Sequence, residues 1–470
     1  MRIFRAVSVS VLLIGLAASP ADGQWTQFRG PNGSGVGSGA GYPVEFSSSN
    51  NVVWKAAVPS GPSSPVVVGG RLFVTATQGG QLITICLDAK TGKEVWRKKI
   101  PPARTHKIYH ANDPASPTPV ADDNGVVVFF PDFGLVAYSN DGKEAWRFPL
   151  GPFRNFYGMA ASPIMADGMV VLVGDQAQGS FVLALERSSG RVRWKTERPG
   201  RPVGWATPMV FRPAGQPPQL VVLGSAHLDA YDLAGGQSRW WMRVASQGGL
   251  GTPVASGDSV LISTLAGTEP WMPEFGPMLE KYDRNADGRL SEAEFKTDAD
   301  LGEHFGWLDD NSDGIVERAE WMAAREMGVG EFGAMAIRPD NARGQLLPDA
   351  IRWRFQKNLP FIPAPLVYQD VFYMVRDGGI ITALDVATGK LLKEGRSREA
   401  LGGYSASPVA ADGKVYLAND EGKITVLQAG GQWQVLGVND LGEQIRATPA
   451  LSNGRIYVRT DDAVYCFGRT

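Results

Sequence analysis

Residues 87–96 read Leu-Asp-Ala-Lys-Thr-Gly-Lys-Glu-Val-Trp, and this stretch recurs in altered form along the chain. It joins the end of one β-rich run to the start of the next through a Gly turn, and the second run carries a Trp. Similar turns end at Gly142, Gly190 and Gly389. A Trp is found in the same place in six units: Trp96, Trp146, Trp194, Trp240, Trp353 and Trp433. The pattern indicates one supersecondary unit copied many times.

A second motif marks the start of each unit: a small residue, then a Pro, then a β-rich run. Pro is tolerated at the first residue of a strand. Most starts lie about 45 residues apart, and four β-rich runs per unit of that length are typical of a propeller blade. The starts are Ser64-Pro65, Ser116-Pro117, Ser162-Pro163, Thr207-Pro208, Thr252-Pro253, Ala364-Pro365, Ser407-Pro408 and Thr448-Pro449. We therefore predict an all-β fold, an eight-bladed β-propeller of four-stranded blades.

The two ends of the repeat region complement each other. Trp54 lies in a β-rich run that precedes the first start, whereas the last unit, 449–467, lacks a fourth run. We expect the N-terminal run to complete the last blade, because this closes the ring and removes two sheet edges. A Trp repeated at one place in each blade indicates packing between blades. The alternative is a set of platforms on which a ligand stacks.

Composition excludes several classes of protein. The 470 residues include 57 Gly and 32 Pro, and 43% of the chain is hydrophobic, so the chain turns often and still has material for a core. The formal net charge is −2, which gives no general basic field for nucleic acid. Two cysteines exclude a disulfide-rich scaffold. Apart from the first residues, no apolar stretch has the length of a membrane span.

The first residues have the pattern of an export signal. Arg2 and Arg5 precede an uncharged run of 13 residues, 6–18, and Ala-Asp-Gly follows at 21–23. The run is shorter than the roughly 20 residues that a helix needs to cross a bilayer, and small residues favour cleavage. We expect cleavage near Gly23 and a periplasmic or extracellular protein. An uncleaved anchor is the alternative.

The segment 87–96 resembles the PQQ-like β-propeller repeat. That family includes quinoprotein alcohol dehydrogenases and the propeller of the outer-membrane-protein assembly machinery, and the opening at 25–33 is similar to exported bacterial members. The resemblance covers about 25–265 and 332–470. In the family that the repeat resembles, active dehydrogenases carry adjacent paired cysteines over the cofactor PQQ. Here Cys86 and Cys466 are far apart in the chain, and we expect two buried free thiols.

The β-rich pattern stops at 266–331, and this insertion contains two loops with the spacing of an EF-hand. Both provide side-chain oxygens at positions 1, 3, 5 and 12 and a backbone carbonyl at position 7. Calcium prefers six to eight hard oxygen ligands, which this spacing gathers around one point. The predicted ligands are Asp283, Asn285, Asp287, Arg289 and Glu294 in loop one (283–294), and Asp309, Asn311, Asp313, Ile315 and Glu320 in loop two (309–320).

Flanking patterns support both loops. Each follows a helical apolar face, Phe275 to Tyr282 before the first and Leu301 to Leu308 before the second. Leu290 and Val316, both at position 8, are predicted to pair as a short β-bridge. The loop starts are only 26 residues apart, so the helix that leaves loop one must be short. A turn without metal is the alternative.

The predicted organisation is a signal at 1–23, propeller at 24–265 and 332–470, and the insertion at 266–331. We expect an exported, non-catalytic binding or scaffold protein that binds calcium, with an unidentified protein or small molecule at the propeller face. The alternative is a PQQ-dependent dehydrogenase with its ligand in the propeller funnel. Candidate funnel residues precede the first strands of the blades: Tyr109, His110, Asn112, Tyr157, Trp205, Tyr404 and Arg446.

Overall fold

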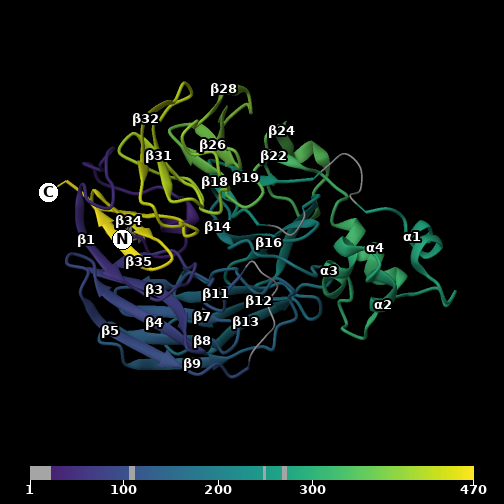
Figure 1. Cartoon of the computed structure of the whole chain (residues 1–470). Helices are drawn as coiled ribbons and strands as arrows, with labels where there is room; N and C mark the ends of the chain where they lie inside the picture. Colours follow the sequence, from purple (N-terminus) through teal and green to yellow (C-terminus); the bar gives the residue numbers. More distant parts are fainter. Residues whose placement is uncertain (1–22, 105–111, 247–249, 267–271, 470) are drawn as a thin grey trace, which may run out of the picture.

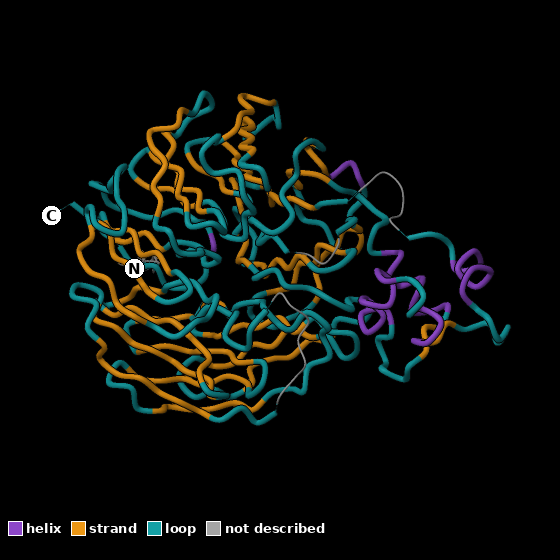
Figure 2. The backbone as a smooth tube through the Cα atoms, viewed as in Figure 1, coloured by secondary structure: helices purple, strands orange, loops and turns teal. Residues whose placement is uncertain are grey.

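The protein is an eight-bladed β-propeller with a helical segment on one side (Figure 1). This computed structural model describes residues 23–104, 112–246, 250–266 and 272–469. The predicted export signal, except Gly23, lies outside these ranges, as do Tyr109 and His110. Helices α1 to α4 all fall within the insertion (Figure 2).

The first four blades follow the chain, each from its inner strand outwards. Blade one contains β2 (Val66–Val68), β3 (Arg71–Gln78), β4 (Gln81–Asp88) and β5 (Glu94–Ile100), and blade two contains β6 (Val120–Asp122), β7 (Gly125–Phe130), β8 (Gly134–Ser139) and β9 (Glu144–Pro149). Blade three contains β10 (Ile164–Ala166), β11 (Met169–Gly174), β12 (Phe181–Glu186) and β13 (Val192–Glu197), and blade four contains β14 (Met209–Phe211), β15 (Gln219–Leu223), β16 (His227–Asp232) and β17 (Ser238–Arg243).

The insertion interrupts blade five between its second and third strands. Blade five contains β18 (Val254–Ser256), β19 (Ser259–Thr264), β22 (Gly333–Ile337) and β24 (Ile351–Phe355), and blade six contains β25 (Leu366–Tyr368), β26 (Val371–Arg376), β27 (Ile380–Asp385) and β28 (Leu391–Arg396). Blade seven contains β29 (Val409–Ala411), β30 (Lys414–Ala418), β31 (Lys423–Gln428) and β32 (Gln434–Asp440). The remaining strands of the propeller are β33 (Ala450–Ser452), β34 (Arg455–Arg459), β35 (Ala463–Phe467) and β1 (Val52–Ala57).

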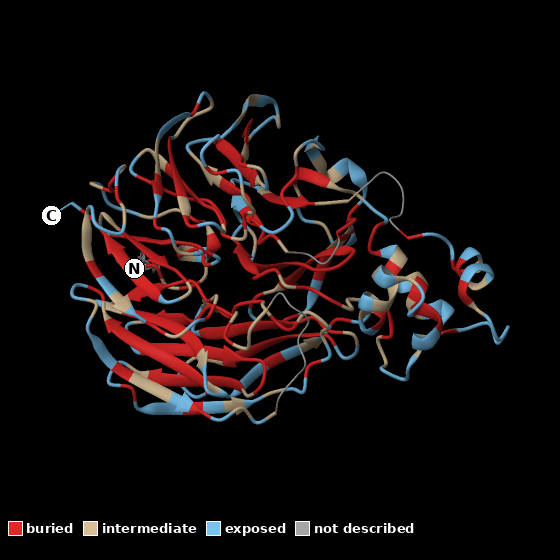
Figure 3. Cartoon of the chain, viewed as in Figure 1, coloured by how far each residue is buried: buried red, intermediate tan, exposed pale blue. Residues whose placement is uncertain are grey.

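Ring closure by the N-terminal strand is confirmed. β1 pairs antiparallel with β35 and opposes Trp54 to Cys466, so blade eight is built from both ends of the chain. The inner strands are buried and the outer ones partly exposed (Figure 3), which is why the outer strands alternate apolar and polar residues.

The Trp of one blade packs on the Gly turn of the next. The Trp146 indole N–H donates to the Arg187 carbonyl at 2.9 Å, and an added Cβ at Gly190 would lie 2.6 Å from the Trp146 ring. Only a residue without a side chain fits beneath the ring, which explains why Trp and Gly repeat together. The other such pairs are Trp54 with Gly92, Trp96 with Gly142, Trp194 with Gly236 and Trp353 with Gly389.

Two members of the Trp set differ from the prediction. Trp433 lies in the turn before β32, and Trp240 donates to Gln219 Oε1 within its own blade. Blade five has no Gly turn of the usual kind beside Trp240. Instead, its short strand β23 (Gly344–Gln345) pairs in parallel with β17 and makes blade four five-stranded.

Replacing Gly190 with Ala should destabilise the protein more than replacing Gly168 with Ala. Both glycines have a positive φ, +69° and +75°, so both variants lose about 1–2 kcal/mol from the left-handed backbone. Only Gly190 is covered by a Trp ring, whereas an added Cβ at Gly168 meets no atom within 4 Å. The overpacking at Gly190 should cost a further ~1–3 kcal/mol. Equal losses in chemical denaturation would show that the Trp contact carries little energy.

Hydroxyl groups join neighbouring blades at the residue two before each inner strand. At six of the eight junctions the backbone N–H of this residue donates to the hydroxyl of its counterpart in the next blade, at 3.0–3.1 Å. The counterpart in blade two is Thr118, so the predicted start at Ser116-Pro117 is wrong by two residues. Ala364 has no hydroxyl to continue the series in blade six.

Residues 24–37 form a plug in the centre of the propeller, which the sequence did not predict. The plug includes the short helix η1 (Pro31–Gly33) and hydrogen-bonds to six of the eight blades, at or just before their inner strands. The partners of its residues are Val67, Ala121, Met165, Val210, Pro365 and Ala410, and Ser452 bonds to Gly23 just before it. A segment that reaches this many inner strands must lie on the propeller axis.

Candidate functional site

The insertion contains α1 (Phe275–Tyr282), α2 (Glu292–Phe295), α3 (Ala299–Leu308) and α4 (Arg318–Glu326). Both predicted helices before the loops are therefore confirmed, and the helix after loop one has only four residues. Strands β20 (Leu290–Ser291) and β21 (Ile315–Val316) pair antiparallel and oppose Leu290 to Val316, as the sequence predicted. The second short 3₁₀ helix, η2 (Pro348–Ala350), lies outside the insertion.

In loop one, the side-chain oxygens at positions 1, 3, 5 and 12 turn towards the backbone of the loop itself. The carboxylate at position 12 also closes the loop, since it bonds to both position 2 and position 9. The donors and acceptors are Asp287 N to Asp283 Oδ1 (3.3 Å) and Asn285 Oδ1 (3.0 Å), Gly288 N to Asp283 Oδ2 (2.9 Å), Arg289 N to Asp287 Oδ1 (2.9 Å), Arg284 N to Glu294 Oε1 (2.9 Å) and Ser291 N to Glu294 Oε2 (2.8 Å).

Loop two repeats this pattern, 26 residues later. The bonds are Asp313 N to Asp309 Oδ1 (3.1 Å) and Asn311 Oδ1 (2.8 Å), Gly314 N to Asp309 Oδ2 (2.9 Å), Ile315 N to Asp313 Oδ1 (2.9 Å), Asp310 N to Glu320 Oε1 (3.2 Å) and Glu317 N to Glu320 Oε2 (2.9 Å). Gly288 and Gly314, both at position 6, have φ of +78° and +84°. The two loops therefore share one backbone fold.

Eight of the ten predicted ligands thus face the interior of their loops through side-chain oxygens; Arg289 and Ile315 would contribute only backbone carbonyls. Among the described residues, no three His, Cys, Asp or Glu side chains gather into a preassembled metal cluster. The carboxylates are instead spread along the loop, where each accepts backbone N–H groups. A divalent cation would have to draw them together.

The two position-12 carboxylates lie in different environments. Hydrogen bonds from the Ser291 backbone and side chain lower the pKa of Glu294 below its ordinary value. Burial raises the pKa of Glu320, and Asp310 lies beside it. At position 1 the order of burial favours loop two, since Asp309 is buried and Asp283 half-buried, whereas at position 12 Glu294 is buried and Glu320 half-buried.

The insertion packs against blades two to four, although in the chain it interrupts blade five. Arg154, between blades two and three, donates to the Asn311 carbonyl at 3.1 Å, and the Trp205 ring packs on the apolar core of the insertion. Arg243 at the end of β17 donates to the carbonyls of Glu326 (3.0 Å), the last residue of α4, and of Val329 (3.1 Å), which follows this helix. The propeller therefore holds loop two and α4 from both sides.

The predicted aromatic ring of the funnel is not present as such. Tyr157 and Trp205 pack edge to face, and Trp205 N–H donates to the Gly158 carbonyl. Tyr404 is buried and its hydroxyl donates to Ala400, whereas Arg446 is exposed. These contacts show that Tyr157, Trp205 and Tyr404 take part in loop packing and in docking of the insertion. A ligand at the funnel stays a prediction.

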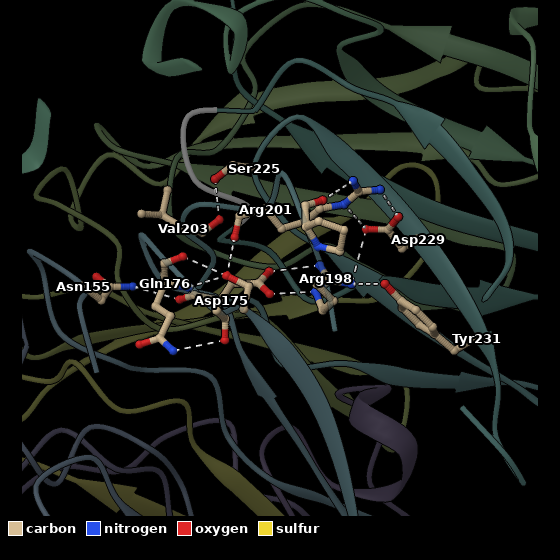
Figure 4. A network of polar contacts seen from close by, with 12 residues as sticks. Asn155, Asp175, Gln176, Arg198, Arg201, Val203, Ser225, Asp229 and Tyr231 are labelled. Atoms are coloured by element: carbon tan, nitrogen blue, oxygen red, sulfur yellow. Dashed lines mark hydrogen bonds and ion pairs between the residues drawn. The ribbon is translucent and has the colours of Figure 1, made fainter. Parts of the chain in front are cut away.

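A buried charge network, which the sequence did not reveal, joins blades three and four (Figure 4). Arg198 donates to both oxygens of Asp175, at 2.6 and 2.9 Å, and its Nη1 donates to the Tyr231 hydroxyl. Asp229 Oδ2 lies 3.2 Å from Arg198 Nη1, and the Asp229 carboxylate also accepts hydrogen bonds from Nε and Nη2 of Arg201. Burial alone would lower the pKa of Arg198, but the two carboxylates raise it above its ordinary value.

Cys86 and Cys466 are both buried and free, as predicted. Burial raises their pKa values to about 12 and about 11, so both thiols stay protonated and unreactive at neutral pH. They lie on third strands of neighbouring blades. They do not form the adjacent pair that the resemblance associates with PQQ.

Comparison with known proteins places the fold. A family model described as outer membrane protein assembly factor BamB matches residues 44–264 and 343–435. BamB from Moraxella catarrhalis is 14% identical, with 89% of this chain and 98% of that chain covered and a TM-score of 0.54. A europium-containing methanol dehydrogenase is 11% identical, with coverages of 96% and 99% and a TM-score of 0.59. Quinohemoprotein alcohol dehydrogenase from Comamonas testosteroni is 12% identical, with coverages of 95% and 81% and a TM-score of 0.57.

At these identities the structural likeness shows the fold alone, because one propeller fold hosts many functions. No curated protein matches the sequence. Within the described ranges, none of the helices has the length and apolar character of a membrane span. The family model covers more than half of the chain, and the protein therefore belongs to the PQQ-like propeller family described as outer membrane protein assembly factor BamB.

Proposed function

We propose that this protein is an exported, non-catalytic binding or scaffold propeller whose insertion binds two calcium ions through EF-hand loops. One observation carries the calcium proposal: loops one and two have the same hydrogen-bond pattern at the same positions and are joined through position 8. Two unrelated Asx-rich turns would not share every one of these features.

The ligands would be the same in both loops. Carboxylate oxygens come from positions 1, 5 and 12, an amide oxygen from position 3 and a backbone carbonyl from position 7. This set consists only of hard oxygen atoms, which suits calcium rather than zinc or copper. Bound calcium would replace the internal hydrogen bonds of each carboxylate and join the two ends of the loop.

Charge supports the same proposal. Residues 283–320 contain 12 acidic and 4 basic side chains, so this segment repels itself in the absence of cations. Folding of the insertion should therefore be coupled to calcium. An exported protein meets calcium at about 10⁻³ M, where even sites of roughly 10⁻⁴ M affinity are filled. Calcium would then be structural and would hold the insertion on the propeller.

The binding role of the propeller is supported by family membership, since the family is described by an assembly factor. The connecting loops between blades, together with the insertion, provide a large irregular surface of the kind that binds proteins. Export is supported by the pattern at 1–23. We therefore propose that the propeller binds a protein partner on the surface formed by the connecting loops and the insertion.

Loop two should bind calcium more tightly than loop one. It has carboxylates at positions 1, 5, 9 and 12, whereas loop one has Ser291 at position 9, and ligand charge raises affinity. In calorimetry, Glu320→Gln should remove the tighter site and Glu294→Gln the weaker one. Glu292→Gln is the matched control, because it removes a loop-one carboxylate at position 10, which is not a ligand position. No heat of binding at millimolar calcium would refute the proposal.

A further inference from the structure

A cleft of about 360 Å³ lies where the insertion meets blades three and four. Its walls come from the β11–β12 loop and the segment after β13, from β16 and β17, and from loop two and α4. The volume lies within the range of roughly 300–1,000 Å³ that is typical of small-molecule sites, and such sites favour junctions between structural units. The cleft exists only because the insertion docks here.

Most side-chain acceptors at the cleft already have partners. Arg198 and Arg201 line the cleft, and their guanidinium groups donate to Asp175 and Asp229 behind them (Figure 4). Gln176 Oε1 accepts from the Arg154 N–H. Of the carboxylates on its walls, Glu326 lies 3.2 Å from Arg243 and Glu197 lies 3.5 Å from Lys195, whereas Asp310 lies beside a second carboxylate, Glu320.

Donors, in contrast, remain available. Arg243 donates through Nε and Nη2, and no bond to its Nη1 is found among the described residues. His227 lines the cleft and is 9% exposed, and its buried Nδ1 has no partner in the described part of the chain. Burial, with Arg201 and Arg243 close by, lowers its pKa to about 4, so the imidazole is neutral at physiological pH. A surplus of donors in a half-enclosed site favours a ligand rich in acceptor oxygens.

We propose that this cleft binds a small carboxylate-bearing molecule, with Arg243 and His227 as the groups that hold the carboxylate. Arg198 and Arg201 lie behind them and keep this wall of the site rigid, since both are held by Asp175 and Asp229. The proposal rests on the proposed function in one respect, because calcium would hold the docked insertion that forms one wall of the cleft, and the titration is therefore made at millimolar calcium.

The test is an NMR titration of the full exported chain with succinate at millimolar calcium. The protein has four histidines, and His227 is assigned by the His227→Gln variant. Succinate should shift the His227 ring signals saturably, with half-saturation at ~1 mM or below, which corresponds to about −4.1 kcal/mol. Succinamide, the neutral analogue, should cause no saturable shift. Acetyl-dialanine distinguishes a peptide C-terminus from a free organic acid as the source of the carboxylate.

Two variants make the result specific. Arg243→Gln should weaken succinate binding tenfold or more, because it removes a charged donor. Ala323→Trp fills the cleft from α4 without removing a polar group and should abolish the shift. Arg212→Gln breaks only an exposed ion pair with Asp167 and should bind like the wild type. The absence of a saturable shift, or an unchanged shift in Ala323→Trp, would overturn the proposal, whereas calcium uptake is measured separately.

Discussion

A chain that lacks residues 24–60 should aggregate or fail to fold. These residues contain both the plug and β1, and four of their large apolar side chains are nearly inaccessible to solvent: Trp25, Tyr42, Phe46 and Trp54. At about 1.5–3 kcal/mol for each buried side chain, their loss removes on the order of 10 kcal/mol. That is comparable to the whole net stability of a typical protein, about 5–15 kcal/mol.

Two deletions separate the contribution of the plug from that of β1. Removal of 24–46 alone leaves β1 to pair with β35, so this chain should melt at a lower temperature and stay monomeric. Removal of 24–60 also exposes the backbone edge of β35, whose residues 463–467 are all buried, and an open edge of this kind pairs with other chains. Light scattering and thermal melting measure both effects. A monomer with unchanged melting after the longer deletion would contradict ring closure by β1.

The second large effect is expected at the buried charge network. Asp175→Ala should lower the free energy of unfolding by about 3–5 kcal/mol, because it leaves the Arg198 guanidinium buried and only partly compensated. The side chains of Arg198 and Asp175 are 0% and 1% exposed, so water cannot replace the lost carboxylate. The cleft should open or collapse with it, since Arg198 lines it.

Controls are available in the same region. Arg212→Ala breaks an ion pair with Asp167 in which both side chains are about half exposed, and it should cost about 0–1 kcal/mol. The double variant Asp175→Ala, Arg198→Met should recover part of the loss, because it removes the unpaired charge. Chemical denaturation measures each free energy. A loss at Asp175→Ala no larger than that at Arg212→Ala would show that the network is not a source of stability.

Local, repeated features of the fold were predictable from the sequence. The Gly turn and the Trp that follows it are neighbours in the chain and lie at the same place in each unit. The number of blades, the closure of the ring and the bounds of the insertion could therefore be predicted. The loops of the insertion were predictable for the same reason: each is a continuous run of 12 residues. Position 8 of each loop sufficed to predict the pairing of Leu290 with Val316.

Long-range contacts were not predictable in the same way. The plug joins residues near Gln27 to blades that lie more than 100 residues away, and no local pattern encodes its partners. Docking of the insertion depends on Arg154 and Arg243, which look like ordinary surface charges in the sequence. Asp175, Arg198 and Asp229 belong to different strands and loops, and only the propeller brings them together. The run from Trp25 to Gly33, rich in Gly and aromatic residues, was the one available signal of the plug.

The most direct test of calcium binding by the insertion is the number of calcium ions held by each chain. Native mass spectrometry of the protein, loaded with calcium and then freed of excess metal, should find two ions in the wild type. Glu294→Gln and Glu320→Gln should each hold one, the double variant none, and the control Glu292→Gln two. A wild-type chain without calcium, or a double variant that retains both ions, would contradict the account.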